Sequence, residues 1–466
     1  MNVSTSTPST ALSRLARQAR AMAIDTVPEE VRRQARLCLL DSVGCMLAGT
    51  RTQEAALIMD CEPALLDGSG AGIVGTSQRR DWRGAVRVNG YLGDVLELND
   101  LIGGHASIGV VTATLALAET LGAPGVRALE ALVRGIEVTA RVYGAVYPSL
   151  KRYTDMALVP VGIPSSIGAA AAAACLLELD EDRTQQAMAI AAGLAGWCPA
   201  EVIFGNGGTV KPMLFGAQPA DTGVTAAWYA RAGMTGPAAI LDGKTGYFAT
   251  ASSAGHLDTA AWEGRWALSQ PRRKLHACCG YLHAPVDAMR RLARQLGPYR
   301  DDRRIEVRVA PYVADVVAKD RPPHSANDAR FHLQFCVALA ACGADVILPE
   351  HSIAFEQQLQ REELRTAMAR VVVRPDPAMS HYHQCEVSVS DGGGRAVSQA
   401  LSAPRGSPQE PLSDEDVIGK FMVLSAPVIG SESARRFVDA CLALEQLGDM
   451  RELSTLLSLP PKERMP

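Results

Sequence analysis

The segment LELNDLIGGHASIG, residues 96–109, places two carboxylates, a Gly-Gly pair and a histidine within an apolar stretch of the chain. The residues before it predict a helix, on which Asp94, Glu97 and Asp100 follow each other at intervals of three and share one side. Like charges at this spacing repel, so the pattern fits either a solvated acidic stripe or a group of acceptors for proton transfer. A Mg²⁺ site is a third interpretation, because carboxylate oxygens suit that ion, but no phosphate-binding motif accompanies it.

His105 follows the two glycines and precedes the apolar run ASIGVVTATLALAE, which predicts a helix that begins directly after the histidine. The helix dipole at an N-terminus disfavours the imidazolium and favours a neutral ring that can accept a proton. A histidine at a helix start is commonly structural, so the segment alone leaves both interpretations open.

Two further stretches hold candidate polar groups. Lys211 lies in FGNGGTVKPMLFGAQPADTG (204–223), where the absence of G-x-x-x-x-G-K-[ST] argues against nucleotide binding. A lysine buried there would need an anion, such as a substrate carboxylate, and a surface lysine is the alternative. A cationic and aromatic cluster suited to di- or tricarboxylates lies in PRRKLHACCGYLHAPVDA (271–288), and it comprises Arg272, Arg273, Lys274, His276, Tyr281 and His283.

The elements that must position these groups are mainly helical. Apolar periodicity with Gly, Pro or acidic stops predicts helices over 83–98, 107–121, 126–146, 164–178, 183–197 and 220–233. Alternating β-branched residues predict strands within 305–318, 370–376 and 385–401, with a hairpin turn at 391–394 and helices over 327–343 and 361–370. After the linker 403–413, helices return to about residue 458.

We therefore predict a mainly α protein. Residues 1–270 and 405–466 would form a large helical domain, and residues 271–404 a smaller α+β domain inserted between them. The cleft between two domains is the default position for a ligand site.

Composition excludes several classes of partner. The chain has 46 Lys+Arg against 50 Asp+Glu and no basic stripe, which argues against a nucleic-acid partner. No stretch approaches the roughly 18–20 apolar residues of a membrane span.

The 11 cysteines include no C-x-x-C pair, which favours a reduced, cytoplasmic location and argues against a zinc site. The Ser- and Arg-rich N-terminus fits a transit peptide or, as we favour, a first helix bearing Leu12 and Leu15.

In order along nearly the whole chain, these motifs resemble the MmgE/PrpD family, which includes 2-methylcitrate dehydratase, cis-aconitate decarboxylase and iminodisuccinate epimerase. The segments that carry the resemblance are LLDSVGCMLAGT (39–50), VNGYLGDVLELND (88–100), GHASIGVVTATLALAE (104–119), IGAAAAAACLLELD (167–180), GGTVKPMLFG (207–216), GMTGPAAILDGKTGYF (233–248), KLHACCGYLHAPVDA (274–288) and SPQEPLSDEDVIGKF (407–421).

The resemblance implies a large helical domain built from both chain ends, a smaller α+β lid inserted between them, and a homodimer. It also implies catalysis without a metal or organic cofactor, through proton transfer at the carbon alpha to a carboxylate of a small di- or tricarboxylate. We expect a carbon–oxygen or carbon–carbon lyase. An epimerase on the same scaffold and an inactive carboxylate-binding member remain alternatives.

Matching positions assign the site residues. We hypothesise that Lys211 and Lys274 hold carboxylate oxygens of the substrate and stabilise its enolate-like negative charge. His105 would move the proton at the alpha carbon, and Glu97 with Asp100 would set the tautomer of His105 or act as partner acid. The expected substrate-binding residues are Lys274, Asp94, Asn99, His276, Tyr281 and Tyr153.

Several positions depart from the family pattern. Asp94 and Asn99 stand where the family has a histidine and an aspartate, and Leu101 replaces a common threonine. Val159 replaces an active-site histidine and Phe335 a tyrosine, and neither side chain can transfer a proton. We therefore expect a less polar pocket and a substrate with fewer carboxylates or a hydrophobic group. The candidates for the missing proton function are Tyr153, His276 and Tyr281.

Overall fold

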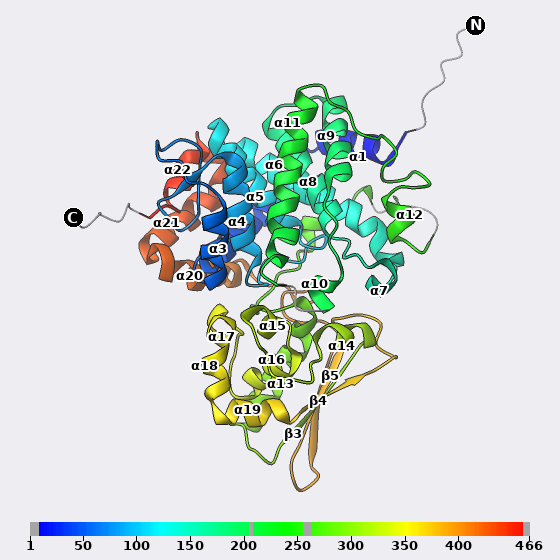
Figure 1. Cartoon of the computed structure of the whole chain (residues 1–466), viewed down its shortest axis with the longest axis vertical. Helices are drawn as coiled ribbons and strands as arrows, with labels where there is room; N and C mark the ends of the chain where they lie inside the picture. Colours follow the sequence, from blue (N-terminus) through cyan, green and yellow to red (C-terminus); the bar gives the residue numbers. More distant parts are fainter. Residues whose placement is uncertain (1–8, 205–207, 255–258, 260–261, 460–466) are drawn as a thin grey trace, which may run out of the picture.

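The computed structural model describes residues 9–204, 208–254, 259 and 262–459. Figure 1 shows a larger helical body above a smaller body that contains a sheet. The larger body holds α1 (Ala11–Ala21), α2 (Glu29–Gly49), α3 (Gln53–Cys61), α4 (Trp82–Asp94), α5 (Ala106–Leu121), α6 (Gly125–Val146), α7 (Tyr153–Met156), α8 (Gly162–Leu176), α9 (Glu181–Leu194), α10 (Glu201–Phe204), α11 (Gln218–Arg231), α12 (Tyr247–Ala251), α20 (Asp414–Ile429), α21 (Ser431–Leu442) and α22 (Met450–Thr455), with the short strands β1 (Ala71–Gly72) and β2 (Arg79–Arg80).

The centre of the larger body is the alanine-rich helix α8, which packs against α5, α6, α9 and α11. The helix axes approach closely because the contact residues are small. A Cβ atom on Gly168 would lie 1.8 Å from Thr139 Oγ1 and 2.4 Å from the Gly135 carbonyl oxygen. Small residues at these contacts therefore fix the spacing between α6 and α8.

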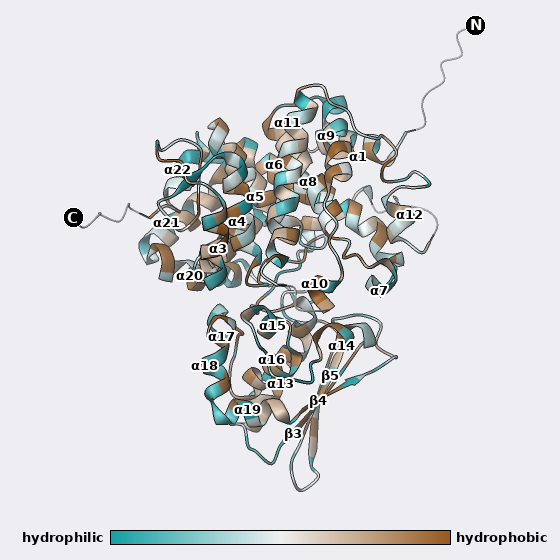
Figure 2. Cartoon of the chain, in the orientation of Figure 1, coloured by the Kyte–Doolittle hydropathy of each residue, from teal (hydrophilic) through white to brown (hydrophobic). Residues whose placement is uncertain are grey.

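The smaller body is built on a four-stranded sheet. Its elements are α13 (His283–Leu296), β3 (Arg304–Val309), α14 (Pro311–Val317), α15 (Ala326–Arg330), α16 (Leu333–Ala341), α17 (Pro349–Ile353), α18 (Phe355–Gln360), α19 (Glu362–Ala369), β4 (Val371–Pro375), β5 (Cys385–Ser390) and β6 (Ala396–Leu401). The strand order is β4-β3-β5-β6, with β3 parallel to β4 and antiparallel to β5. Figure 2 shows hydrophobic residues along β4 and β5 and hydrophilic residues along α18.

The buried apolar side chains form two clusters. One draws on residues 11–277 and 412–457, so the C-terminal helices complete the core that the N-terminal helices begin. The other lies mainly within residues 278–389 and also takes in Val159, Val161, Ile203 and Phe215 from the helical part. The predicted mainly α class is confirmed, while the domain boundaries at 270 and 404 stay a prediction. Among the described residues, no helix is long and apolar enough to cross a membrane.

Three predicted elements differ from the structure. The helix expected over 83–98 ends at Asp94, so Asp94, Glu97 and Asp100 do not share one helix face. Residues 311–317, expected as strand, form α14, because Pro311 suits the first turn of a helix. The helix expected over 327–343 is interrupted, and His332 caps α16 by accepting the Phe335 amide N–H. The hairpin turn at 391–394 is confirmed by the pairing of β5 with β6.

Candidate active site

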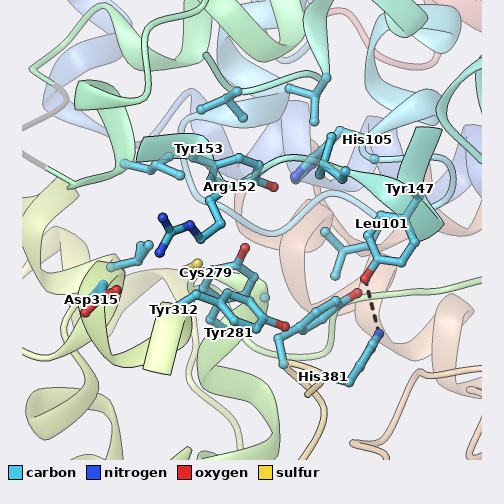
Figure 3. A pocket seen from close by; sticks show the side chains of 18 of the residues that line it. Leu101, His105, Tyr147, Arg152, Tyr153, Cys279, Tyr281, Tyr312, Asp315 and His381 are labelled. Atoms are coloured by element: carbon cyan, nitrogen blue, oxygen red, sulfur yellow. Dashed lines mark hydrogen bonds between the residues drawn. The ribbon is translucent and has the colours of Figure 1, made fainter. Parts of the chain in front are cut away.

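A cavity of about 520 Å³ lies where the helical part meets the α+β part. Its walls come from the end of α6 and residues 147–161 of the helical part, and from residues 272–281, α14 and residues 380–382. Figure 3 shows Tyr153 and His105 on one side of this space and Tyr281 and Tyr312 on another. The cavity therefore lies at the place where the sequence predicted a ligand site.

The loop after α4 carries Glu97 in a left-handed backbone conformation, with φ of 53°. A second left-handed stretch, Gly103–Gly104–His105, leads into α5 and gives His105 a φ of 80°. Positive φ costs a non-glycine residue about 1–2 kcal/mol, so the surrounding packing must hold both conformations. Among the described non-glycine residues, a positive φ occurs elsewhere only at Ala157 and Glu178. Strained backbone is thus found at two of the residues that line the cavity.

Glu97 is bound between two buried lysines. The Lys274 ammonium donates to the Glu97 carbonyl oxygen at 2.9 Å and to Glu97 Oε2 at 3.2 Å. Lys211 Nζ contacts Glu97 Oε1 and donates to Asp94 Oδ2 at 2.8 Å. Each of the four side chains is at most 4% exposed, and two carboxylates offset two ammonium groups. Burial lowers the pKa of both lysines, and Asp94 opposes that shift at Lys211.

Asn99 connects this ion cluster to His105. Its amide nitrogen donates to Asp94 Oδ1 at 2.7 Å, and its carbonyl oxygen lies 2.6 Å from His105 Nδ1. A carboxylate accepts only from the amide nitrogen, so the carbonyl oxygen must face the imidazole and Nδ1 must carry the hydrogen. His105 Nε2 therefore keeps its lone pair. Burial, and then the Lys274 charge, lower the pKa of His105 to about 3.

Burial and Lys274 thus favour the neutral imidazole that the sequence led us to expect. His105 is the N-cap residue of α5, as predicted. Its ring packs against Phe215 with 5.4 Å between centroids. A neutral imidazole with a free Nε2, in a cavity that Lys274 also lines, can accept a proton from a bound carbon acid.

The structure does not bring Asp100 or His276 into the cavity. The Asp100 carboxylate accepts the Ile102 N–H at 3.2 Å, and burial, together with Asp41, raises its pKa to about 6. His276 Nδ1 accepts the Ile347 N–H at 3.1 Å, which leaves its other nitrogen to bond to Asp287 at 3.3 Å. Both side chains have protein partners and lie outside the lining, so neither reaches the space beside His105.

The Mg²⁺ interpretation of the acidic segment has no geometric support. Asp94 and Glu97 are each paired with a lysine, and Asp100 lies apart from them. Among the described residues, no three His, Cys, Asp or Glu side chains converge as a metal site would require.

Tyr153 and Tyr281, predicted to bind substrate, do line the cavity. Burial raises the pKa of Tyr153 to about 12 and that of Tyr281 well above its usual value, so both hydroxyls stay protonated at neutral pH. Asp94, Asn99 and Lys211 lie behind the cavity surface and act on it through Glu97 and His105. Lys274 reaches the surface itself.

Residues 13–260 match the MmgE/PrpD N-terminal domain, and residues 276–446 match the MmgE/PrpD C-terminal domain. The chain belongs to the MmgE/PrpD family. It is 27% identical to the cis-aconitate decarboxylase-like protein oryM of Aspergillus oryzae, over 93% of this chain and 94% of that protein. It is 24% identical to a cis-aconitate decarboxylase of Aspergillus terreus (95% and 94% covered) and 25% identical to that of Mus musculus (94% and 91% covered). These relatives support an enzyme of the lyase type.

Some of the departures from the MmgE/PrpD pattern line the cavity, and others lie outside it. Val159 and Leu101 line the cavity, so two positions that carry polar side chains in the family pattern are apolar here. Phe335 is buried in the core of the smaller body, so the expectation that it removes a hydroxyl from the pocket is not supported. The less polar pocket expected from the sequence thus rests on Val159 and Leu101.

Sequence reasoning missed several residues of the cavity. Tyr147 and His381 meet across it, with 3.2 Å between the Tyr147 hydroxyl oxygen and His381 Nε2 (Figure 3). Arg272 was named only as part of a cationic cluster, and Tyr143, Tyr312 and Tyr382 were not named. The run HYH at 381–383 is a signal that could have directed attention to this side of the smaller body.

Proposed function

We propose that this protein is a lyase that transfers a proton at the carbon alpha to a carboxylate of a small di- or tricarboxylate-like substrate, without a cofactor. The observation that carries the proposal is the chain Asp94–Asn99–His105, which holds the His105 ring with Nε2 unprotonated beside the cavity. The relatives, named cis-aconitate decarboxylase or cis-aconitate decarboxylase-like, support the reaction class.

His105 Nε2 is the base in this proposal. When it takes the alpha proton, the electron pair of the C–H bond passes into the carboxylate and gives an enediolate. The Lys274 ammonium lies at the cavity surface and stabilises the added negative charge. A bound carboxylate also offsets the field of Lys274, which raises the pKa of His105 towards a useful value.

The second half of the reaction depends on the leaving group. In a dehydration, the electron pair expels a β-hydroxyl group, which takes up a proton and leaves as water. In a decarboxylation, CO₂ departs without prior loss of the alpha proton and its bonding pair stays on carbon. That carbon then takes a proton from a protonated group such as the Tyr153 hydroxyl, which regains its proton from water. Tyr153 is our candidate for the acid at the leaving group, since its protonated hydroxyl lies in the same cavity (Figure 3).

Glu97 and Lys211 act as positioning residues. Glu97 fixes the Lys274 ammonium through two hydrogen bonds, and Lys211 holds both Glu97 and Asp94. The sequence suggested that Lys211 holds a substrate carboxylate. Its anions are instead carboxylates of this chain, so only Lys274 keeps the role of charge stabiliser at the substrate.

Turnover in D₂O tests the function. A panel of hydroxy-, unsaturated and amino-dicarboxylates is incubated with the purified chain and followed by NMR. We expect loss of water or CO₂ from one member, and we expect His105→Gln to abolish it. His324→Gln, which alters an exposed histidine outside the cavity, is the matched control.

The other outcomes of this experiment identify the alternatives. Deuterium incorporation with inversion and no loss of mass would replace the lyase with an epimerase. Full activity of His105→Gln would overturn the mechanism. Binding of dicarboxylates without exchange or turnover would identify an inactive carboxylate-binding member.

The family resemblance also leads us to propose a homodimer, and the 11 cysteines without a C-x-x-C pair lead us to propose a cytoplasmic location. Light scattering on the purified chain tests the dimer, and imaging of a tagged chain in its host cell tests the location.

A further inference from the structure

The cavity gathers most of the tyrosines of a chain in which aromatic residues are only 5%. Six of the 10 tyrosines line it, namely Tyr143, Tyr147, Tyr153, Tyr281, Tyr312 and Tyr382. Several of their rings contact one another. The centroid distances are 5.4 Å between Tyr143 and Tyr147, 5.8 Å between Tyr281 and Tyr312, and 5.3 Å between Tyr281 and Tyr382. We call these six residues the tyrosine wall. Aromatic rings in contact offer a surface for another ring or for an apolar chain.

Arg272 is the cation of the cavity that has no anionic partner. Its guanidinium donates to the Tyr382 hydroxyl at 3.4 Å, and it pairs with no acidic residue in the described part of the chain. By contrast, Lys274 is paired with Glu97. The cavity lining includes the acids Glu97 and Asp315, but Arg272 forms an ion pair with neither. A half-buried guanidinium that has no acidic partner is suited to a planar carboxylate.

The other two cations of the lining are already engaged. Arg152 is paired with Asp155, and its side chain is 79% exposed. Lys151 donates to the carbonyl oxygens of Ala249 and Thr250. Arg272 is therefore the group that a second carboxylate of a ligand would meet.

The size and apolar lining of the cavity favour a ligand larger than a small polycarboxylate. Its volume of about 520 Å³ lies within the roughly 300–1,000 Å³ of pockets that hold drug-sized ligands. Val159, Leu101, Phe215 and Phe331 add apolar surface to the tyrosine wall. A ligand that left this surface in water would forgo the free energy of its burial.

We propose that the substrate is a dicarboxylate with an aryl or similarly large apolar substituent. Its reacting carboxylate lies at Lys274, its second carboxylate binds Arg272, and its substituent packs on the tyrosine wall. The inference rests on the proposed function for the identity of the reacting end. It goes further in naming the substituent and the residue that recognises the second charge.

Calorimetry with three non-reacting probes tests this inference on the unaltered chain. Benzylsuccinate has both carboxylates and an aryl group, succinate lacks the aryl group, and 4-phenylbutyrate lacks one carboxylate. We expect benzylsuccinate to bind at least about tenfold more tightly than either of the others, because each loses one of the two contacts. Benzylsuccinate that binds no better than succinate, or no measurable binding of either, overturns the proposal.

Two variants assign the contacts. Arg272→Gln should weaken benzylsuccinate and succinate by about tenfold or more and leave 4-phenylbutyrate within about twofold. Tyr312→Ala, at a position that is 36% exposed, should weaken benzylsuccinate but not succinate. The control Arg152→Gln removes a cation of the lining that is already paired, and it should leave all three affinities within about twofold. Unchanged benzylsuccinate affinity in folded Arg272→Gln overturns the role of Arg272.

These measurements use no turnover, so they separate the two proposals. If the binding pattern is found and His105→Gln retains activity, the catalytic assignment fails and the ligand class stands. If His105→Gln abolishes turnover of an unsubstituted dicarboxylate and the binding pattern is absent, the ligand class fails and the catalytic assignment stands.

Discussion

Asn99 joins Asp94 to His105 through the two ends of one amide group, with 2.7 Å from its nitrogen to Asp94 Oδ1 and 2.6 Å from its oxygen to His105 Nδ1. The amide cannot rotate without placing its oxygen against a carboxylate. The ring orientation and tautomer of His105 therefore depend on Asn99, although Asn99 does not reach the cavity surface.

We expect Asn99→Ala to lower kcat/KM by about 10–100-fold, the usual effect of removing a residue that orients a functional histidine. Asn89→Ala is the matched control, because Asn89 is also a buried asparagine with two hydrogen bonds, to Val74 N–H and the Gly72 carbonyl. Both variants should lose similar stability in urea, and only Asn99→Ala should lose activity. Equal kcat/KM in the two variants would show that Asn99 acts only in folding.

The ion cluster around Glu97 predicts strong coupling between buried charges. Glu97→Gln leaves two buried ammonium groups facing one remaining carboxylate, and breaking a buried pair commonly costs about 3–5 kcal/mol. Lys211→Met should restore part of that loss, because it removes one of the unpaired charges. We expect a coupling free energy above about 1 kcal/mol in a double-mutant cycle measured by urea unfolding.

The exposed pair Arg152–Asp155 provides the control cycle. Its coupling should stay below about 1 kcal/mol, since water screens exposed charges. Additive effects of Glu97→Gln and Lys211→Met would contradict the ion cluster.

His105 should stay neutral across the physiological pH range. Burial and Lys274 lower its pKa from 6.5 to about 3, whereas the unfolded chain takes up a proton near 6.5. The stability that neutral His105 contributes is therefore present above pH 6.5 and is lost as the pH falls towards 3. Nitrogen NMR of labelled histidine should show the Nδ1–H tautomer from pH 5 to 8 in a signal that His105→Gln removes.

An anionic ligand should change this titration. Succinate bound near Lys274 offsets the positive field on the imidazole, so the pKa of His105 should rise when the ligand is added. A His105 signal that already reports imidazolium at pH 6 without ligand would contradict the geometry.

Sequence periodicity predicted most helices because their apolar faces are set by nearby residues. The helices expected at 107–121, 126–146 and 220–233 correspond to α5 (Ala106–Leu121), α6 (Gly125–Val146) and α11 (Gln218–Arg231). The helix expected over 83–98 ends early at Asp94. The lysines that bind Asp94 and Glu97 come from positions 211 and 274, and no local pattern contains that information.

The sequence predicted several residues of the candidate site, but it did not predict how these residues contact one another. The sequence identified His105, Glu97, Lys211 and Lys274, but it placed the lysines on the substrate rather than on Glu97. It could not show that Asp100 does not line the cavity and accepts the Ile102 N–H instead. Of the tyrosine wall, the sequence named only Tyr153 and Tyr281, because residues 143–153 and 281–382 are far apart in the sequence and meet only through the contact between the two bodies.

We expect that ionised Asp100 destabilises the fold and takes no part in catalysis. Burial, and then Asp41, raise its pKa from 3.8 to about 6, so the folded chain binds its proton more tightly than the unfolded chain does. Its contribution to stability is present below about pH 4 and is lost as the pH rises through 6. We expect Asp100→Asn to be more stable than the unaltered chain by about 1–3 kcal/mol at pH 8, with the difference vanishing near pH 4.

Urea unfolding at the two pH values checks this, and kcat/KM should stay within about threefold, because Asp100 does not line the cavity. A large loss of kcat in a variant of unchanged stability would instead return Asp100 to the catalytic group that the family pattern implies.

The packing of α8 on α6 gives a last prediction, in which two glycines of the larger body respond in opposite ways to the same substitution. At Gly168 a Cβ atom would lie 1.8 Å from Thr139 Oγ1 and 2.4 Å from a backbone oxygen of α6, so Gly168→Ala must push the helices apart. We expect a loss of about 3 kcal/mol or more. At Gly144, which lies in α6, nothing lies within 4 Å of an added Cβ atom, so Gly144→Ala should stabilise by about 0.5–1 kcal/mol through the helix propensity of alanine. Urea unfolding of both variants measures the difference, and a Gly168→Ala chain as stable as the unaltered one would show that the spacing between α6 and α8 adapts.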